Sequence, residues 1–163
     1  MWFESYIQNN VDAFKNKVST IANALGIKID YLMAVMAFES RINPAAVNPV
    51  SGATGLIQFM PATAQSLGTT AAALRAMTNV EQLDYVYQYL RPYSGRMNTL
   101  ADVYFAVFFP VAIGKPDDWV LKTSSLTASK IAEQNPLFDL NKDNQITVGE
   151  VKQYWDNWLK KKV

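Results

Sequence analysis

Apolar residues recur at intervals of three and four along nearly the whole chain, which is the spacing of amphipathic helices. The first series ends before Gly26, a stop signal for a helix, and consists of Phe3, Ile7, Val11, Phe14, Val18, Ile21 and Leu25. No segment shows a convincing two-residue alternation, as a half-buried β-strand would. The sequence therefore predicts a mainly α fold.

Short polar side chains mark the starts of the later helices. Asp30 is the predicted N-cap of the helix that contains the apolar run 31–38, and Thr78 and Thr99 are predicted to cap two more. The helices expected after the first are 30–42, 61–68, 79–91, 100–109, 126–138 and 148–159. The helix over 100–109 is apolar nearly all round, so we expect it at the centre of the fold.

One carboxylate stands on an otherwise apolar helix face. Glu39 follows the run 31–38 and falls on one helical stripe with Val35 and Met36. Burial and a position near a helix C-terminus both raise the pKa of a carboxyl group, because they disfavour the anion. A carboxyl group that is partly protonated near neutral pH suits general acid catalysis. The alternative is an exposed residue at the helix end, or one paired with Arg41.

The composition excludes several chemistries. The 163 residues include no Cys and no His, so disulfides, thiolate nucleophiles, Ser-His triads and His-bound zinc are all excluded. The formal net charge is +1, and the only basic block is 160–162, which argues against a nucleic-acid partner. Residues 1–5 lack the pattern of a signal peptide, and no apolar stretch is long enough to cross a bilayer, so we expect no membrane insertion.

Glu39 lies in one short motif and is followed by a second. The first is Phe38-Glu39-Ser40, and the second, beyond a loop rich in Gly, Pro and Ser, is Gly55-Leu56-Ile57-Gln58-Phe59-Met60-Pro61-Ala62-Thr63-Ala64. In this order the pair resembles the soluble lytic transglycosylase (SLT, goose-type lysozyme-like) family, whose second motif is close to G-L-M-Q-x-M-P-x-T-A. The resemblance is strongest over 31–67, and it implies a lysozyme-like helical domain.

The third motif of the family is usually Y-N-A-G. Its counterpart lies within 101–110, where Tyr104 and Ala106 match, while Phe105 and Val107 replace the usual Asn and Gly. This departure looks more like a bacteriophage-encoded branch of the family. It favours a phage endolysin, a virion-associated lysin or a domain of a longer tail protein. Such a protein would reside in the virion, or in the host cytoplasm before release to the cell wall and periplasm.

The resemblance implies cleavage of the β-1,4 bond between N-acetylmuramic acid and N-acetylglucosamine in peptidoglycan strands. Glu39 would act as general acid and then as base, forming a 1,6-anhydro product without a catalytic cofactor. No second acid is conspicuous beside it, although Asp102 lies in the third motif and is a candidate. The alternatives are a lysozyme-type hydrolase on the same scaffold, a non-catalytic glycan-binding virion module, and a Ca²⁺-dependent interaction protein.

The residues expected to contact the substrate belong to the motifs, and they are Ser40, Gln58, Phe59, Met60 and Tyr104. Each has a structural alternative: Ser40 as a helix-end cap, Gln58 as a brace of its loop, and the apolar residues as core. Aromatic side chains also cluster around the helix over 79–91, namely Tyr85, Tyr87, Tyr89 and Tyr93. One or two of these could line a sugar cleft, while core packing is the more common role for any single one.

The segment 139–150 follows the twelve-residue pattern of an EF-hand calcium loop. The predicted ligands, at loop positions 1, 3, 5, 7 and 12, are Asp139, Asn141, Asp143, Gln145 (through its carbonyl) and Glu150. Asn144 stands at position 6, where Gly is usual, and it tolerates the positive φ required there. A structural Ca²⁺ ion is therefore expected. The alternative is an acidic turn loop without metal.

The motifs predict a lysozyme-like transglycosylase domain over 1–125 and an EF-hand-like helix–loop–helix over 126–163, packed on the same domain. The length of the chain fits a single domain with a substantial core. The expected partner is the glycan strand of bacterial peptidoglycan, and the expected oligomeric state is a monomer.

Overall fold

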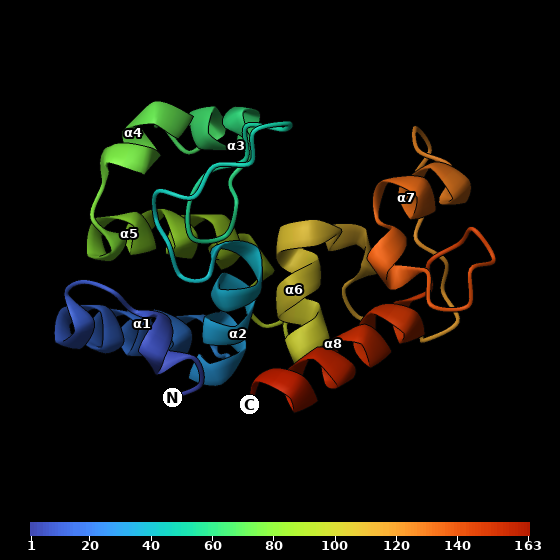
Figure 1. Cartoon of the computed structure of the whole chain (residues 1–163), viewed down its shortest axis with the longest axis horizontal. Helices are drawn as coiled ribbons and strands as arrows, with labels where there is room; N and C mark the ends of the chain where they lie inside the picture. The colour runs from blue at the N-terminus through green and yellow to red at the C-terminus, as the bar shows by residue number, and fades with distance from the viewer. The chain divides into compact units, whose positions relative to one another are not determined.

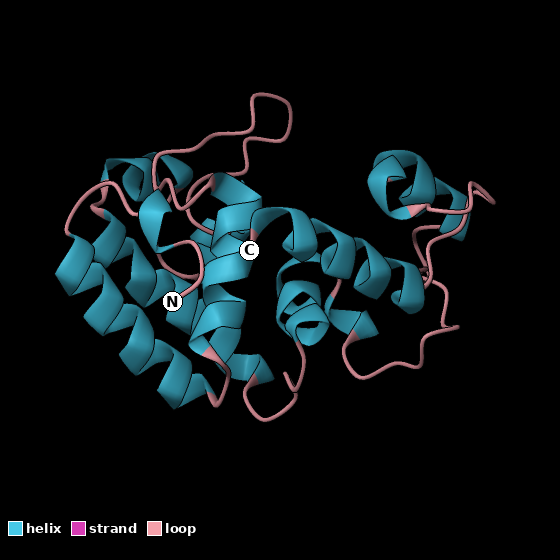
Figure 2. Ribbon diagram, turned by 60° about the horizontal axis from the view of Figure 1, so that its bottom comes forward, coloured by secondary structure: helices cyan, strands magenta, loops and turns pink.

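Helices make up 58% of the protein in a computed structural model that describes residues 1–163, and no strand is present (Figure 2). This confirms the predicted mainly α fold. The α-helices are α1 (Val11–Leu25), α2 (Ile29–Ser40), α3 (Pro61–Ser66), α4 (Ala71–Ala76), α5 (Asn79–Leu90), α6 (Leu100–Phe108), α7 (Ala128–Gln134) and α8 (Val148–Lys162). The short 3₁₀ helices are η1 (Glu4–Tyr6), η2 (Arg91–Tyr93), η3 (Pro110–Ala112) and η4 (Pro136–Phe138).

The chain divides into two compact units, Met1–Val103 and Tyr104–Val163, and the division falls within α6. The sequence-based division at 125/126 separates the two groups of motifs, and it stays a prediction. The two units reflect which residues pack together in space, whereas the division at 125/126 follows the positions of sequence motifs, so the two boundaries can differ.

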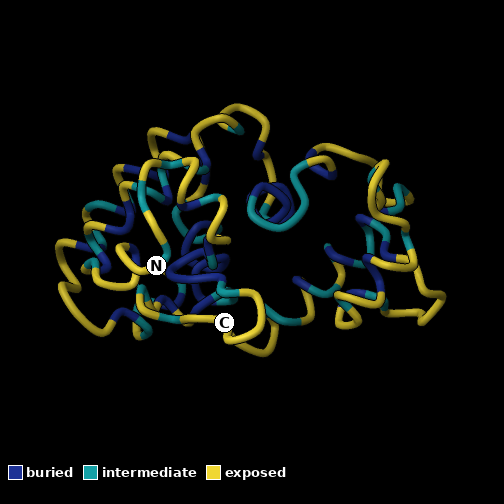
Figure 3. Tube along the Cα trace, turned by 90° about the horizontal axis from the view of Figure 1, so that it is seen from above, coloured by how far each residue is buried: buried dark blue, intermediate teal, exposed yellow.

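The core of the first unit is built around α2. Helix α1 packs against both α2 and α5 (Figure 1). Six consecutive residues of α2, 32–37, are buried, and Figure 3 shows the interior of this unit in dark blue. A helix that is apolar all round is stable only when its neighbours cover every face. The helix that carries Glu39 is therefore the central one of its unit.

The observed first residues of α1 and α2 differ from the predicted ones. Helix α1 begins only at Val11, since Asn10 adopts the left-handed conformation with φ 53° and breaks the periodic series. The predicted N-cap Asp30 is wrong: the N-cap is Lys28, and Asp30 lies in the first turn. Its Oδ1 accepts a hydrogen bond from the backbone N–H of Trp2 at 2.9 Å. A long-range partner thus draws this carboxylate away from the cap.

The other predicted caps are confirmed. Thr78 caps α5 in a reciprocal capping box: its hydroxyl oxygen accepts from the Glu81 N–H, and the Glu81 carboxylate accepts from the Thr78 N–H. At the start of α6, the Thr99 hydroxyl oxygen accepts from the Asp102 N–H at 3.1 Å. Such caps stabilise a helix by about 1 kcal/mol each, because they satisfy donors that the helix itself leaves unpaired.

The second unit has an aromatic core. The rings of Phe138 and Trp155 lie 5.7 Å and 5.1 Å from the ring of Tyr104. The segment before α7 pairs with the segment that leads into α8: the Leu121 N–H donates to the Ile146 carbonyl at 2.8 Å. Ile146 is fully buried, so the middle of the polar 139–150 segment is tied to the core of this unit.

No single helix combines the length and the apolar composition that a membrane span requires. Only α1 and α2 taken together meet those criteria, and the chain bends by 115° between them.

Candidate active site

Glu39 lies in the last turn of α2, two residues before the C-cap Arg41. Its side chain is half-buried, and burial raises its pKa from the ordinary value of 4.5 to about 7. The cause is desolvation, which penalises the carboxylate relative to the neutral acid. The shift has the direction that the sequence predicted. A carboxyl group with this pKa carries a proton in about half of the molecules at neutral pH, as a general acid must.

The backbone immediately after Glu39 is strained. Arg41 and Ile42 both adopt the left-handed conformation, with φ 56° and 58°. This is rare for a β-branched residue such as Ile42 and costs about 1–2 kcal/mol. The turn is held because Ile42 is buried and its N–H donates to the Met36 carbonyl at 3.2 Å. Strain maintained by surrounding packing is common at functional sites, where it fixes the exit of the chain.

The second motif forms a tight loop beside this turn. Thr54 and Phe59 exchange two backbone hydrogen bonds, of 2.9 Å and 2.8 Å, across the four residues between them. Both Gly55 (φ 88°) and Gln58 (φ 57°) adopt the left-handed conformation inside the loop. Gly55 is required sterically, since a Cβ there would lie 2.4 Å from Oε1 of Gln82.

Ser40 joins this loop to the helix that carries the acid. Its Oγ lies 3.1 Å from the Met36 carbonyl and 2.9 Å from the Leu56 carbonyl, and one hydroxyl hydrogen serves both acceptors. The residue is buried. Ser40, the residue next to Glu39, thus links the end of α2 to the middle of the second motif.

Gln82 was missed by the sequence reasoning. It is fully buried on α5, where Oε1 accepts from the Leu56 N–H at 2.6 Å. Its Nε2 donates to the Pro44 carbonyl at 2.9 Å and to the Leu74 carbonyl at 2.8 Å. The available signal was a polar residue four positions before Val86 on an apolar helix stripe, which is the same kind of signal that identified Glu39.

The remaining predicted contacts in the second motif lie at different depths. Gln58 turns its amide into the loop, where Nε2 donates to the carbonyls of Ala46 and Gly55 at 3.2 Å and 3.1 Å. Phe59 is buried, while Met60 is 47% exposed. Among the motif residues expected to touch sugar, Met60 therefore presents the largest free surface.

One tyrosine that the sequence could not single out, Tyr89, lies within the electrostatic reach of the acid. Tyr89 packs edge-on against Phe59, with ring centroids 6.2 Å apart, and its ring is 6.2 Å from that of Tyr93. Burial, then Tyr93 and then Glu39 raise the pKa of Tyr89 to about 12. Among these causes the charge of Glu39 has the smallest effect. Tyr89 is therefore a neutral hydrogen-bond donor at any working pH.

The two predicted residues of the third motif lie in different units. Asp102 is 8% exposed in the first unit, where Oδ2 accepts from the backbone N–H groups of Asn98 and Thr99, both at 3.1 Å. These bonds make Asp102 part of the cap of α6. Tyr104 is buried in the second unit, and its ring stacks on Phe108 at 5.3 Å.

The predicted calcium loop is folded by its own polar groups. Asp139 Oδ2 accepts from the Asn144 N–H at 3.0 Å, whereas Oδ1 is buried and has no hydrogen-bond partner. Asn144 has φ 62°, as the sequence required at this position. Glu150 Oε2 accepts from the Leu140 N–H at 2.8 Å. No group of three or more acidic side chains is gathered closely enough to hold a metal ion.

A buried helix presents one carboxyl group of near-neutral pKa beside a loop fixed by buried polar side chains, and this arrangement suits acid–base chemistry. Residues 16–107, more than half of the chain, match the family model of the transglycosylase SLT domain. The chain belongs to this family, which consists of peptidoglycan lytic transglycosylases. It is an enzyme, and peptidoglycan is its substrate. A comparison with curated proteins finds no match.

Proposed function

We propose that Glu39 cleaves the β-1,4 bond between N-acetylmuramic acid and N-acetylglucosamine as the only acid–base residue of the site. The observation that carries this proposal is the half-buried Glu39 carboxyl group with a pKa of about 7. Its proton passes to the glycosidic oxygen as the bond to C1 breaks. The resulting carboxylate then takes the proton of the C6 hydroxyl group while O6 bonds to C1. Glu39 returns to its starting state, no water is consumed, and the product is a 1,6-anhydro sugar.

The surroundings of Glu39 support a reaction with one carboxylate. Asp102 uses Oδ2 to cap α6, so it is engaged in holding the backbone rather than serving as a second acid. Glycosidases with two acids place both carboxyl groups around the scissile bond. Burial keeps the Tyr89 hydroxyl group protonated, so it adds no second negative charge near Glu39 when the carboxylate forms.

Mass spectrometry of the fragments released from purified sacculi tests this proposal. Wild-type protein should release anhydro-muropeptides, each lighter by one water than the hydrolysis product. Glu39→Gln should remove release while keeping the fold, because the amide cannot donate an acidic proton. The matched control is Glu133→Gln, which alters an exposed carboxylate of α7 and should leave release unchanged.

Each other outcome contradicts a stated part of the proposal. Products with hydrated reducing ends would show that the protein is a lysozyme-type hydrolase and would contradict formation of the 1,6-anhydro sugar. Retention of protein on sacculi without any release would indicate a glycan-binding module. Full release by the folded Glu39→Gln variant would remove Glu39 from the mechanism.

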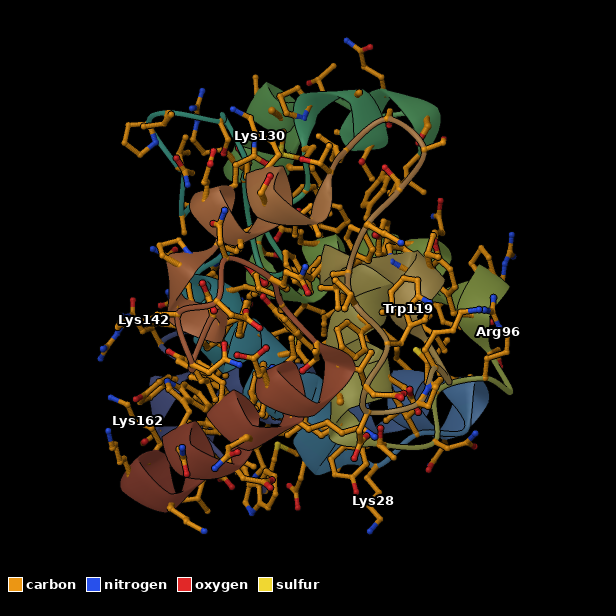
Figure 4. The ribbon with its side chains drawn as sticks, turned by 90° about the vertical axis from the view of Figure 1, so that its right-hand side faces the viewer. Lys28, Arg96, Trp119, Lys130, Lys142 and Lys162 are labelled. Atoms are coloured by element: carbon orange, nitrogen blue, oxygen red, sulfur yellow. The ribbon has the colours of Figure 1, made fainter.

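We also propose that the 139–150 loop binds one structural Ca²⁺ ion. The supporting observation is Asp139 Oδ1, a buried acceptor without a hydrogen-bond partner, since such an atom carries a desolvation cost that a cation would offset. The donors named by the loop pattern are all oxygen, which suits Ca²⁺. The carboxylates of Asp139, Asp143 and Glu150 are not gathered in this structure, so they would have to draw together around the ion. Lys142 is exposed and extends away from the loop in Figure 4, which leaves the interior to the acidic groups.

Calorimetry with Ca²⁺ and with a chelator tests this second proposal. Because a ligand that binds only the folded state stabilises it, Ca²⁺ at 100 times its Kd should add about 2.7 kcal/mol and raise the Tm. Asp139→Asn should abolish the rise. Asp156→Asn, on the exposed side of α8, should retain it. An identical Tm with Ca²⁺ and with chelator would refute the metal site.

The assignment to a bacteriophage endolysin or virion-associated lysin, and the location that it implies, stay predictions. They rest on Phe105 and Val107 in the third motif.

A further inference from the structure

We infer that Gln82 is a positioning residue for the reaction: it holds the backbone of Leu56 in register with Ser40 and thereby fixes the second motif loop beside Glu39. The inference rests on the proposed function. It assigns a role in positioning the site to a residue that lies outside the sequence motifs.

The backbone of Leu56 is held by buried side chains at both of the peptide groups that flank its Cα. Its N–H donates to Gln82 Oε1 at 2.6 Å, and its carbonyl accepts from Ser40 Oγ at 2.9 Å. Ser40 follows Glu39 directly in the chain. A displacement of the Leu56 backbone is therefore transmitted to the residue next to the acid.

Gln82 also holds the chain on both sides of the loop. Its Nε2 donates to the carbonyl of Pro44, in the segment that leaves α2, and to the carbonyl of Leu74 in α4. The loop that follows α2 runs beside α5 before it reaches α3 (Figure 1). One side chain thus makes three hydrogen bonds to three segments that are separate in the sequence, and all of its donors and its acceptor are used. Removal of this side chain would leave the Leu56 N–H and the Pro44 carbonyl without these partners, while the Leu74 carbonyl would keep only the Met77 N–H.

The packing of Gly55 agrees with this role. An added Cβ at Gly55 would lie 2.4 Å from Gln82 Oε1 and 2.8 Å from Cδ, so the loop backbone lies directly against the amide of Gln82. Such close approach fixes the position of the loop as well as its hydrogen bonds. A site that must be held to within a fraction of an ångström requires support of this kind.

The test compares Gln82→Met with Gln88→Met. Met matches Gln in length but lacks its donor and acceptor, and Gln88 lies on the exposed side of the same helix. At a temperature 20 °C below the Tm of each variant, Gln82→Met should lower kcat for muropeptide release by about tenfold or more, with KM within about threefold of wild type. Gln88→Met should leave both constants unchanged. Hydrogen exchange at the Leu56 amide should accelerate in Gln82→Met alone.

A purely structural role would lower the Tm of Gln82→Met without changing kcat in the folded protein, and that result overturns the inference. If Gln82→Met does not fold, Ser40→Ala tests the same residue, Leu56, through its carbonyl group instead of its N–H. That variant should lower kcat and speed exchange at Leu56, and an unchanged kcat there overturns the inference as well. Absence of muropeptide release by wild-type protein refutes the proposed function itself, and it is observed before any variant is compared.

Discussion

Glu39→Gln is expected to stabilise the folded protein at high pH while it abolishes activity. The pKa of Glu39 is raised from 4.5 to about 7 by burial, so between these values the folded state holds a proton that the unfolded state has lost. The stability contributed by this group is therefore full at low pH and falls as the pH rises through that window. At 1.36 kcal/mol per pKa unit, ionised Glu39 costs the folded state about 3 kcal/mol.

Urea denaturation of wild type and Glu39→Gln across the pH range measures this cost directly. A neutral amide has no ionisation to suppress, so the variant should match wild type near pH 4 and exceed it by about 3 kcal/mol at pH 8. The difference between the two proteins cancels the titration of the other groups. In wild type, activity should fall as the pH rises through about 7, where Glu39 loses its proton. If the free energies of unfolding of wild type and Glu39→Gln differ by the same amount at every pH, the raised pKa of Glu39 is refuted.

Three further predictions follow from single contacts. Gly55→Ala should destabilise the protein by about 2 kcal/mol or more in urea denaturation, because it adds a clash with Gln82 to an unfavourable φ of 88°. Asp102→Asn should retain muropeptide release within about tenfold, since the amide oxygen still caps α6, whereas loss of a second catalytic acid would cost at least about 100-fold. Asn144→Gly should bind Ca²⁺ at least as tightly in isothermal titration, because glycine adopts the φ of 62° without strain, while Asn144→Val should bind more weakly.

Much of the helical fold was predictable because its signals are local. The Thr78 capping box needs only residues three apart, and Pro61 sets the φ of a first helical turn by its own ring. The errors arose where a distant partner decided the outcome or where a polar start signal was overlooked. Asp30 was drawn to Trp2, which lies 28 residues away. Asn10 is a common type of N-cap and tolerates the left-handed conformation, but the apolar series that continues through it hid this signal.

The candidate site divides in the same way. Glu39 was predictable because an ionisable group on an apolar helix stripe differs clearly from its neighbours. Gln82 also interrupts an apolar stripe, but its role depends on a hydrogen bond to Leu56, 26 residues away. The periodicity of one helix cannot predict a contact with so distant a residue. The proximity of Tyr89 to Glu39 likewise depends on how α5 packs in the first unit.

The sequence by itself determined the helical class, the acid and the loop that accompanies it, because periodicity, capping and motif order are properties of neighbouring residues. Only the tertiary structure decided how the acid is held and how readily it ionises. The pKa of Glu39 depends on desolvation by the packed protein, and the position of the second motif loop depends on hydrogen bonds from Ser40 and Gln82. Burial and long-range hydrogen bonds exist only once distant segments meet, and these two effects make a carboxyl group in a helix suited to catalysis.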